Sequence, residues 1–247
     1  MKNNRLITRR QALITGLSSV SGLLLGHCSQ PLPPTYGNIL RMGDALTYGT
    51  HRALLPGQSL AREYPSSAIS SFPAIGTTNP ADPSKAYFSE SYGRLQRKAF
   101  SEWTLSIEGR VSQPGAYSLA DLQGFPSQTQ ITRLSCEEGW SAIAQWTGVS
   151  LSRVLTSAGI LPSARFVNFY AYDGVMESLD LLDAFHPQTL LAYGMNGSRL
   201  PVAHGAPVRL RVANQLGYKS VKYLKRIVVT DEFVDMGDSG WAWYAGI

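Results

Sequence analysis

Residues 133–148 have the sequence RLSCEEGWSAIAQWTG, which places a cysteine beside two acids, a glycine and a tryptophan. A strand predicted over residues 130–135 leads directly into Cys136, so the thiol lies where a strand ends in a turn. A thiolate is a soft ligand that suits a transition metal. Arg133, three residues before Cys136, is expected to lie close enough to stabilise the thiolate. Cys136 is therefore the first candidate for a functional residue.

Cysteine is scarce, because the chain contains only Cys28 and Cys136. No disulfide framework is available, and neither Cys-x-x-Cys nor His-x-x-x-His occurs. The four histidines are scattered, at positions 27, 51, 186 and 204. A metal bound by protein side chains alone takes three or four ligands. A single cysteine therefore serves a metal only where a cofactor supplies the other ligands, and an inert, buried cysteine is the alternative.

A second group of functional residue types surrounds a predicted strand near residue 210. The segments HGAPVRL at residues 204–210 and GYKSVKYL at residues 217–224 contain a histidine, an arginine, two lysines and two glycines. Glycine permits close backbone approach, and arginine and lysine bind phosphate. The residue types leave two interpretations open, an anion site and a solvated basic edge strand.

The pattern of apolar residues predicts a mixed α+β domain. Strands are expected over residues 103–109, 165–172, 190–193, 208–212 and 226–230. Short helices are expected after Ser118 and over residues 151–155, where Gly159 would end the helix. Residues 178–185 are expected to form a short helix or a strand-to-helix segment, and residues 50–85 long loops. Because strands outnumber the short, scattered helices, the α+β class is favoured.

The first 28 residues are predicted to be an export signal. Four of the first ten residues are basic and none is acidic, and the apolar run over residues 12–26 is too short to span a bilayer. Residues 8–13, TRRQAL, resemble a twin-arginine signal, so a periplasmic or otherwise exported location is expected. Residues 29–50 are predicted to form a tether and residues 51–247 the functional domain. Cys28 is either lipidated or removed with the signal.

The remainder of the chain carries little net charge. The 247 residues have a formal net charge of +5, of which the first ten contribute +4. No basic stripe remains for nucleic acid to bind, so a nucleic-acid partner is not expected. Hydrophobic residues make up 44% of the chain, which is enough for a sizeable core and excludes a disordered chain.

Four segments carry a resemblance to a known family: CEEGW at residues 136–140, LAYGMNG at 191–197, HGAPVRL at 204–210 and KSVKYL at 219–224. Their order and spacing resemble those of the sulfite oxidase superfamily, from about residue 85 to the end. This family binds a molybdenum–pterin cofactor, Mo-molybdopterin. The chain is most similar to the periplasmic branch that includes the methionine-sulfoxide reductase catalytic subunit. The resemblance implies a sulfite-oxidase-type fold of mixed β-sheets with short peripheral helices.

The resemblance also implies roles for individual residues. Cys136 corresponds to the thiolate ligand of molybdenum, whose other ligands in the family are two pterin sulfurs and oxygen groups. His204 and Arg209 correspond to contacts with the pterin phosphate.

Three neighbouring residues, Ser220, Val221 and Lys222, correspond to the family's segment that closes on the pyranopterin through backbone groups and a lysine. Asp173 lies where the sulfite oxidase branch has a cofactor-binding acid. A turn formed by Asp-Gly is the alternative interpretation of Asp173.

Two further regions bear on the cofactor and the substrate. Ser89, Glu90 and Ser91 correspond to the family's first cofactor-contacting loop. Tyr244 corresponds to the active-site tyrosine of sulfite oxidases, where a phenol could relay a proton. Sulfite oxidases carry an arginine at the position of Glu90. A carboxylate there would repel sulfite, which favours a neutral substrate such as a sulfoxide.

The resemblance therefore implies an enzyme, a molybdopterin-dependent oxidoreductase that transfers an oxygen atom to or from a small molecule or a methionine sulfoxide side chain. The sequence has no haem-attachment motif Cys-x-x-Cys-His, so a separate cytochrome or membrane haem subunit is expected to exchange its electrons. A monomer is expected. The alternatives are sulfite oxidation and a non-catalytic module that binds the cofactor or a partner.

Overall fold

The computed structural model describes Leu46, Thr50 and residues 59–231. The chain divides into two compact units, Met1–Gly43 and Asp44–Ile247, and every described residue belongs to the second. The predicted signal segment, almost all of the predicted tether and Tyr244 lie outside the described residues. None of the helices in the described part combines the length and the apolar character that crossing a membrane requires.

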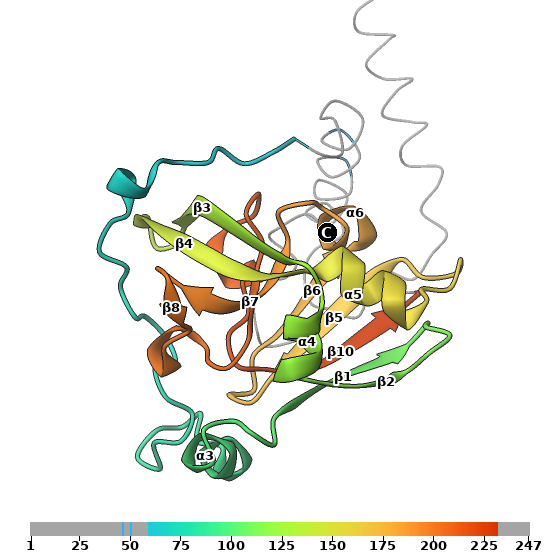
Figure 1. Ribbon diagram of the computed structural model, residues 1–247, viewed down its shortest axis with the longest axis horizontal. Helices are drawn as coiled ribbons and strands as arrows, with labels where there is room; N and C mark the ends of the chain where they lie inside the picture. Colours follow the sequence, from blue (N-terminus) through green and yellow to red (C-terminus); the bar gives the residue numbers. More distant parts are fainter. Residues whose placement is uncertain (1–45, 47–49, 51–58, 232–247) are drawn as a thin grey trace, which may run out of the picture. The chain divides into compact units, whose positions relative to one another are not determined.

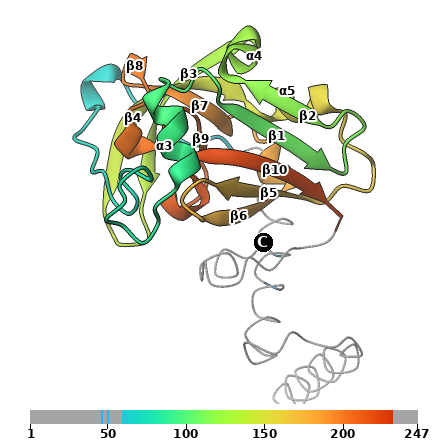
Figure 2. The ribbon, with the colours of Figure 1, turned by 90° about the horizontal axis from the view of Figure 1, so that it is seen from below.

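The first of two sheets has the strand order β2-β1-β10-β5-β6 (Figure 2). Its strands are β1 (Thr104–Gly109), β2 (Gly115–Ser118), β5 (Phe166–Ala171), β6 (Met176–Asp180) and β10 (Leu224–Thr230). β1 and β10 run parallel, with Ile107 opposite Ile227, and the other pairs are antiparallel. Strand β10 therefore lies at the centre of the sheet, between β1 and β5.

The second sheet contains the long hairpin that leads to Cys136. Its strands are β3 (Ser127–Ser135), β4 (Ser141–Ser150), β7 (Leu190–Met195), β8 (Ser198–Arg199) and β9 (Arg209–Arg211). The order is β3-β4-β7-β8, β9 also pairs with β7, and all the pairs are antiparallel. In β4, alternate residues Ala142, Ala144 and Trp146 are buried, as the two-residue period of a strand requires.

Gly148 explains how β4 and β7 pair closely. The register shifts between Thr147 and Gly148. A Cβ atom at Gly148 would lie 2.2 Å from the Leu191 carbonyl oxygen and 2.7 Å from the Ala192 Cα. Only a residue without a side chain fits this approach of the two backbones.

The short helices lie at the periphery of the sheets, and their ends follow from their sequences. A capping box between Ser118 and Asp121 begins α4 (Leu119–Gly124). Gly159, with φ of 71°, ends α5 (Leu151–Ala158). Strand β6 continues directly into α6 (Leu181–Ala184). The described chain also has short 3-10 segments, η1 (Ser66–Ala68), η2 (Val202–His204) and η3 (Gly217–Lys219). These elements confirm the predicted mixed α+β class with short helices.

The helix α3 (Glu90–Arg97) lies where the resemblance implied a cofactor-contacting loop. The Ser89 hydroxyl accepts a hydrogen bond from the Tyr92 N–H at 3.3 Å, which caps the helix. Tyr92 is fully buried, and its hydroxyl donates to the Ala206 carbonyl at 2.7 Å. The cap and this anchor make the segment helical.

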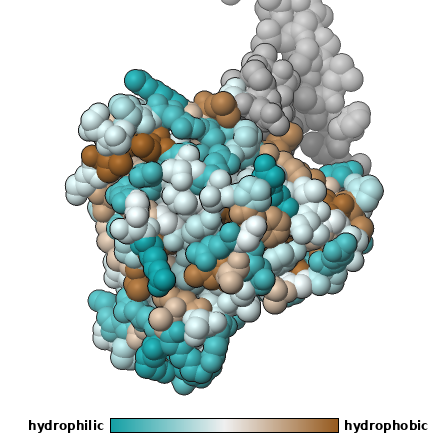
Figure 3. All heavy atoms as spheres, in the orientation of Figure 1, coloured by the Kyte–Doolittle hydropathy of each residue, from teal (hydrophilic) through white to brown (hydrophobic). Residues whose placement is uncertain are grey.

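The hydrophobic core takes residues from both sheets and from α4 and α5. A second, smaller cluster around Trp146, Leu190 and Met195 lies on the opposite face of the second sheet, and Phe72 packs against it. The segment leading from η1 to α3 runs beside this sheet in Figure 1, past β4 and β8. Strand β7 of this sheet is thus buried on both faces, whereas the β3–β4 hairpin is buried mainly on the face that carries Ala142, Ala144 and Trp146. On the face that Figure 3 draws, hydrophobic side chains form separate groups among hydrophilic ones.

Candidate active site

The β3–β4 hairpin ends in the turn that carries Cys136. Beyond the last strand pair, the Cys136 N–H donates to the Trp140 carbonyl at 2.9 Å, and the Gly139 N–H donates to the Cys136 carbonyl at 3.1 Å. Gly139 has a φ of 91°, in the region that favours glycine. The thiol of Cys136 is half-buried and forms no disulfide.

A cavity of about 850 Å³ opens beside this turn. Four segments line it: residues 72–77, the Cys136 turn, the turn between β5 and β6, and parts of residues 204–222. The predicted site residues that line it are Cys136, Asp173, His204, Arg209, Ser220, Val221 and Lys222. The fold therefore brings together residues from the two groups that the sequence suggested, the Cys136 turn and the segments at residues 204–210 and 217–224.

Two glycines allow these segments to meet. A Cβ atom at Gly217 would lie 3.0 Å from Leu134 Cδ2 and 3.5 Å from the Cys136 Cα. A Cβ atom at Gly205, whose φ is 107°, would lie 2.9 Å from the Lys222 Cβ. The glycines of the HGAPVRL and GYKSVKYL segments thus serve close packing of the cavity wall.

Arg209 places a buried cation in the cavity wall. It is 4% exposed, its Nη1 donates to the His204 carbonyl at 3.1 Å, and its Nη2 donates to the Ser220 carbonyl at 2.7 Å. Its guanidinium also lies 5.1 Å from the centroid of the Trp146 ring. Among the described residues, no carboxylate forms an ion pair with Arg209. A buried guanidinium without such a partner is suited to an anionic ligand group.

Lys222 is a second cation in the wall. Its Nζ donates to the carbonyls of Ile75 at 2.9 Å, Ala203 at 3.3 Å and Thr77. Burial, and then the charge of Arg209, lower the pKa of Lys222 to about 8. The ammonium thus ties the segment around Ile75 and Thr77 to the rest of the site.

Asp173 stabilises a turn and also lines the cavity. Its Oδ1 accepts a hydrogen bond from the Val175 N–H at 3.3 Å, which stabilises the turn between β5 and β6. Its side chain also lines the cavity and forms a hydrogen bond with Thr77. Burial raises the pKa of Asp173, while Thr77 and Lys222 act in the opposite direction.

His204 and Phe72 form an aromatic part of the cavity wall. The Phe72 ring packs edge-on against His204 at 5.4 Å, Trp146 at 5.4 Å and Trp140 at 6.1 Å between ring centroids. Burial, followed by the charges of Arg209 and Lys222, lowers the pKa of His204 below 6.5. The imidazole is therefore neutral at pH 7 and can donate a hydrogen bond or accept one.

The thiol of Cys136 adjoins two carboxylates. Its Sγ lies 3.9 Å from the Glu138 Oε2, which also accepts a hydrogen bond from the Trp140 Nε1 at 3.0 Å. Burial raises the pKa of Cys136, and the charges of Glu137 and Glu138 raise it further. A bound metal cation would reverse this effect and favour the thiolate.

Glu90, Ser89 and Ser91 do not line this cavity. The Glu90 side chain is 74% exposed and pairs with Arg94 at 3.1 Å. Ser89 caps α3, and its hydroxyl lies 3.1 Å from that of Ser91. Because the helix turns Tyr92 inward, Glu90 points to solvent. The prediction that these three residues contact the cofactor, with Glu90 near the metal, finds no support in the described structure.

Arg133 also lies away from the cavity. Its side chain is exposed, and its guanidinium lies 5.4 Å from the centroid of the Tyr64 ring. Successive residues of a strand face opposite sides, so residues an odd number of positions apart diverge. The expected contact between Arg133 and the Cys136 thiolate therefore finds no support in the described structure. Tyr244 lies outside the described residues.

Several lining residues were not expected from the sequence, among them Phe72, Ile75, Thr77, Glu177 and Tyr218. The first three belong to the segment predicted only as loops, which has no regular period. Tyr218 lies within the quoted GYKSVKYL segment, but a tyrosine there gives no distinctive signal. Glu177 lies in β6, where its position resembles that of any strand residue.

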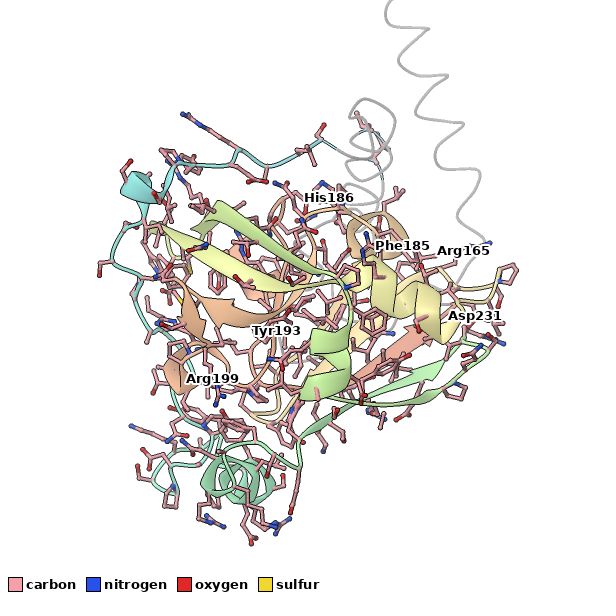
Figure 4. All side chains as sticks on the ribbon, viewed as in Figure 1. Arg165, Phe185, His186, Tyr193, Arg199 and Asp231 are labelled. Atoms are coloured by element: carbon pink, nitrogen blue, oxygen red, sulfur yellow. The ribbon has the colours of Figure 1, made fainter. Side chains whose placement is uncertain are left out.

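Of the two histidines that the structure describes, His186 does not line this cavity. His186 follows α6 (Figure 4), is 1% exposed, and its Nε2 lies 3.2 Å from the Ser59 carbonyl. The described residues contain no group of three or more histidines, cysteines or acids that could hold a metal ion.

The cavity fits the molybdenum–pterin cofactor that the resemblance implies. Cys136 offers one soft ligand, while Arg209 and Lys222 suit an anionic end such as a phosphate. The Oε2 of Glu137 is buried without a hydrogen-bond partner in the described structure, so it can accept a donor from a bound molecule. The acids beside Cys136 and the cations Arg209 and Lys222 therefore match a ligand with a metal at one end and a phosphate at the other.

Comparison with known proteins finds relatives that are named as subunits of protein-methionine-sulfoxide reductases. The chain is 34% identical over 195 residues to a protein of Azospira oryzae that is provisionally named protein-methionine-sulfoxide reductase subunit YedZ1, with 78% of this chain and 70% of the relative covered. It is 31% identical over 248 residues to the protein-methionine-sulfoxide reductase catalytic subunit MsrP of Xanthomonas axonopodis pv. citri, with 94% and 72% covered.

A solved structure shows the same fold. The chain resembles that of the sulfane dehydrogenase SoxCD from Paracoccus pantotrophus, with a TM-score of 0.51 and 24% identity over 53% of this chain and 39% of that one. Residues 92–236, more than half of the chain, match the family described as the oxidoreductase molybdopterin binding domain. This chain therefore belongs to the family of oxidoreductases that bind Mo-molybdopterin.

Proposed function

We propose that this oxidoreductase is exported and removes the oxygen atom from a sulfoxide, such as a methionine sulfoxide side chain. The observation that carries the proposal is the charge beside Cys136. Glu137 and Glu138 adjoin the thiol and line the cavity. Two carboxylates repel an anion such as sulfite, whereas a neutral sulfoxide experiences no such repulsion. The names of the two protein relatives agree with this substrate class.

Different residues of the cavity would bind the two ends of the cofactor. Cys136 would bind the metal through its thiolate, and Arg209 and Lys222 would bind the anionic end of the cofactor. When bound, the cofactor supplies a metal centre that exchanges an oxygen atom and an electron pair. Phe72 and Trp140 form an apolar part of the wall that can contact the carbon groups of a sulfoxide and of the resulting thioether.

Glu137 and Glu138, rather than Glu90, are the acids beside the thiol. The sequence suggested that a carboxylate near the metal disfavours sulfite. Glu90 is exposed on α3, whereas Glu137 and Glu138 occupy the position beside the thiol. The expectation of a neutral substrate therefore rests on the Cys136 turn.

The first experiment is metal analysis of the wild-type protein beside Cys136→Ser. We expect stoichiometric molybdenum in the wild type, and an altered or lost sulfur-to-metal absorption in the variant with its circular dichroism unchanged. A wild type that lacks molybdenum when produced where the cofactor is available would contradict the enzymatic function.

The second experiment separates the substrates. Protein reduced with a dye is mixed with dimethyl sulfoxide or with a peptide that contains methionine sulfoxide, and oxidised protein is mixed with sulfite. We expect reoxidation by the sulfoxides and no reduction by sulfite. Reduction by sulfite, without reoxidation by sulfoxides, would make the protein a sulfite dehydrogenase instead.

We also propose that a separate cytochrome or membrane haem protein delivers the electrons. The sequence has no Cys-x-x-Cys-His motif that would attach a haem to this chain. Co-purification from the producing organism, followed by haem spectroscopy, tests this proposal. We expect a haem protein that is oxidised when this enzyme and a sulfoxide are added.

A further inference from the structure

A buried ion pair lies in the cavity wall, outside the mechanism proposed above. Glu177 of β6 and Lys219 of η3 meet at 3.0 Å between Oε2 and Nζ, and their side chains are 3% and 1% exposed. The Lys219 Nζ also donates to the Ser178 carbonyl at 2.9 Å. Burying two charges costs free energy that their attraction often fails to offset. A pair retained beside a catalytic cavity therefore invites a chemical explanation.

Glu177 connects the ion pair to the cavity. Its Oε2 accepts hydrogen bonds from Lys219 and, at 3.3 Å, from the Ser178 N–H. Glu177 itself lines the cavity together with Cys136 and Tyr218. Its other oxygen, Oε1, accepts no hydrogen bond from the described residues, so it is available to a molecule in the cavity.

Burial brings the proton affinities of the pair closer together. It raises the pKa of Glu177, which the Glu137 charge also raises and Lys219 lowers. It lowers the pKa of Lys219, which Glu177, Asp183 and Asp180 raise. Both burial effects favour the neutral pair of carboxylic acid and amine. A proton can therefore move between Oε2 and Nζ across the 3.0 Å hydrogen bond.

The remaining neighbour in the cavity does not compete for this proton. Burial, Glu177 and Glu137 all raise the pKa of Tyr218, so its phenol stays protonated at neutral pH. Glu177, whose pKa burial raises, is thus the candidate proton donor in this part of the wall.

Removal of an oxygen atom from a sulfoxide consumes protons. The sulfur–oxygen bond breaks, two electrons from the redox partner reduce the sulfur to a thioether, and the oxygen takes up two protons and leaves as water. We propose that Glu177, paired with Lys219, delivers protons to this oxygen within the cavity. The inference rests on the proposed function. Glu177 regains its proton from Lys219 and from water that enters the open cavity.

The test compares three variants of the molybdenum-loaded protein. Glu177→Gln keeps the size of the side chain but cannot carry the proton, and Lys219→Met removes the cationic partner. Glu108→Gln is the control, because Glu108 pairs with Arg226 at 3.9 Å and both side chains are more than 40% exposed, outside the cavity. Each protein is reduced with a dye, and its reoxidation by dimethyl sulfoxide is followed from acid to alkaline pH.

We expect Glu177→Gln to slow reoxidation about tenfold or more, with the molybdenum content and the half-saturating sulfoxide concentration unchanged. Its rate should also lose the decline at rising pH that the wild type shows. Lys219→Met should move this decline to higher pH, because an acid without a cationic neighbour releases its proton less readily. Glu108→Gln should behave as the wild type.

A second measurement needs neither cofactor nor turnover. Infrared difference spectra of the apoprotein between alkaline and acid pH should contain the band of a protonated, buried carboxyl group. The band should be weaker in Glu177→Gln, where only other buried carboxyl groups such as Asp173 remain, and the lost part should appear at higher pH in Lys219→Met.

Three results would overturn the inference. One is a Glu177→Gln rate within about twofold of the wild type. Another is an equal slowing of both variants with an unmoved pH profile, which indicates a purely structural pair. If Glu177→Gln loses its molybdenum, the test rests on Lys219→Met. A pH dependence of its reoxidation rate equal to that of the wild type then overturns the inference. A wild type that no sulfoxide reoxidises would instead refute the proposed function, and this inference with it.

Discussion

Cys136 and Lys222 lie in one cavity, and burial changes their pKa values in opposite directions. It raises the pKa of the thiol and lowers that of the ammonium group. Both shifts favour the neutral forms in the absence of a counter-charge. A metal cation near the thiol and an anionic group near the lysine would each restore the charged form. At the scale of the residue, the site is therefore matched to a ligand that carries both charges.

The pKa of Lys222 predicts how the stability of the apoprotein depends on pH. The pKa falls from 10.5 to about 8 on folding, so the unfolded chain binds more protons between these values. The unfavourable free energy of burying the ammonium is fully present below about pH 8 and disappears as the pH rises to 10.5. The free energy of unfolding should rise over this range by up to about 3 kcal/mol.

Urea unfolding at a series of pH values tests this prediction. Lys222→Met should remove most of the rise, and loading with the cofactor should reduce it, because an anionic neighbour restores the lysine's charge. Equal slopes in the wild-type and Lys222→Met apoproteins would show that other groups cause the pH dependence.

Glu90 provides a test of the corrected placement. The exposed pair with Arg94 is expected to contribute about 0–1 kcal/mol to stability. Glu90→Gln should therefore keep the thermal unfolding temperature and the molybdenum content of the wild type. A marked loss of molybdenum in this variant would restore the role that the family resemblance implied.

At the scale of the elements, the β3–β4 hairpin determines where the thiol lies. Its ladder runs without interruption from the pair of Ser127 with Val149 to the pair of Ser135 with Ser141. Buried side chains cover one face of the hairpin, and the neighbouring strand β7 is buried on both faces. The Cys136 turn therefore rests on a rigid support, and the other lining segments pack against it.

The close pairing of β4 and β7 predicts a large effect at Gly148. A Cβ atom there would meet the Leu191 carbonyl oxygen at 2.2 Å, so Gly148→Ala must push two backbones apart. We expect a loss of about 2–4 kcal/mol in the free energy of unfolding. Denaturant unfolding of the apoprotein measures this loss.

Gly124→Ala is the matched control for Gly148→Ala. Gly124 ends α4, and no atom lies within 4 Å of the Cβ that alanine would add. This variant should have unchanged or slightly increased stability, by up to about 1 kcal/mol. If both variants lost the same free energy, close approach of β4 to β7 would not be the cause.

At the scale of the whole molecule, the cavity depends on segments from residue 72 to residue 222. The carbonyls of Ile75 and Thr77 are linked to Lys222, and Glu177 to Lys219. Such long-range contacts form only when the domain is folded. The cofactor can therefore bind in this cavity only after the domain has folded.

The proposed export predicts the effect of changing Arg9 and Arg10 together to lysine. Twin-arginine export requires the arginine pair, whereas a general basic tail would tolerate lysine. We expect the double variant to remain in the cytoplasm with its molybdenum bound. Fractionation of the producing cells, followed by immunoblotting, measures this. Unchanged export of the double variant would exclude this pathway.

Local patterns in the sequence were sufficient to predict many elements. Ser118 caps a helix, Gly159 ends one, and the strand before Cys136 was expected where β3 lies. Strand β4 was not predicted, because its alternating residues include the small Ala142 and Ala144, which give a weak hydrophobic signal. Helix α3 was interpreted as a loop, since the anchor of Tyr92 on Ala206 is a contact between distant residues.

The sequence by itself determined the class of the fold, the position of Cys136 at the end of a strand, and the group of residues around His204, Arg209 and Lys222. Each of these follows from neighbouring residues or from ordered motifs. Only the tertiary structure placed Phe72 and Glu177 in the cavity and turned Glu90 and Arg133 out of it. The direction of a side chain depends on the strand or helix that carries it and on the distant segments that pack against that element, and these long-range contacts leave no local pattern in the sequence.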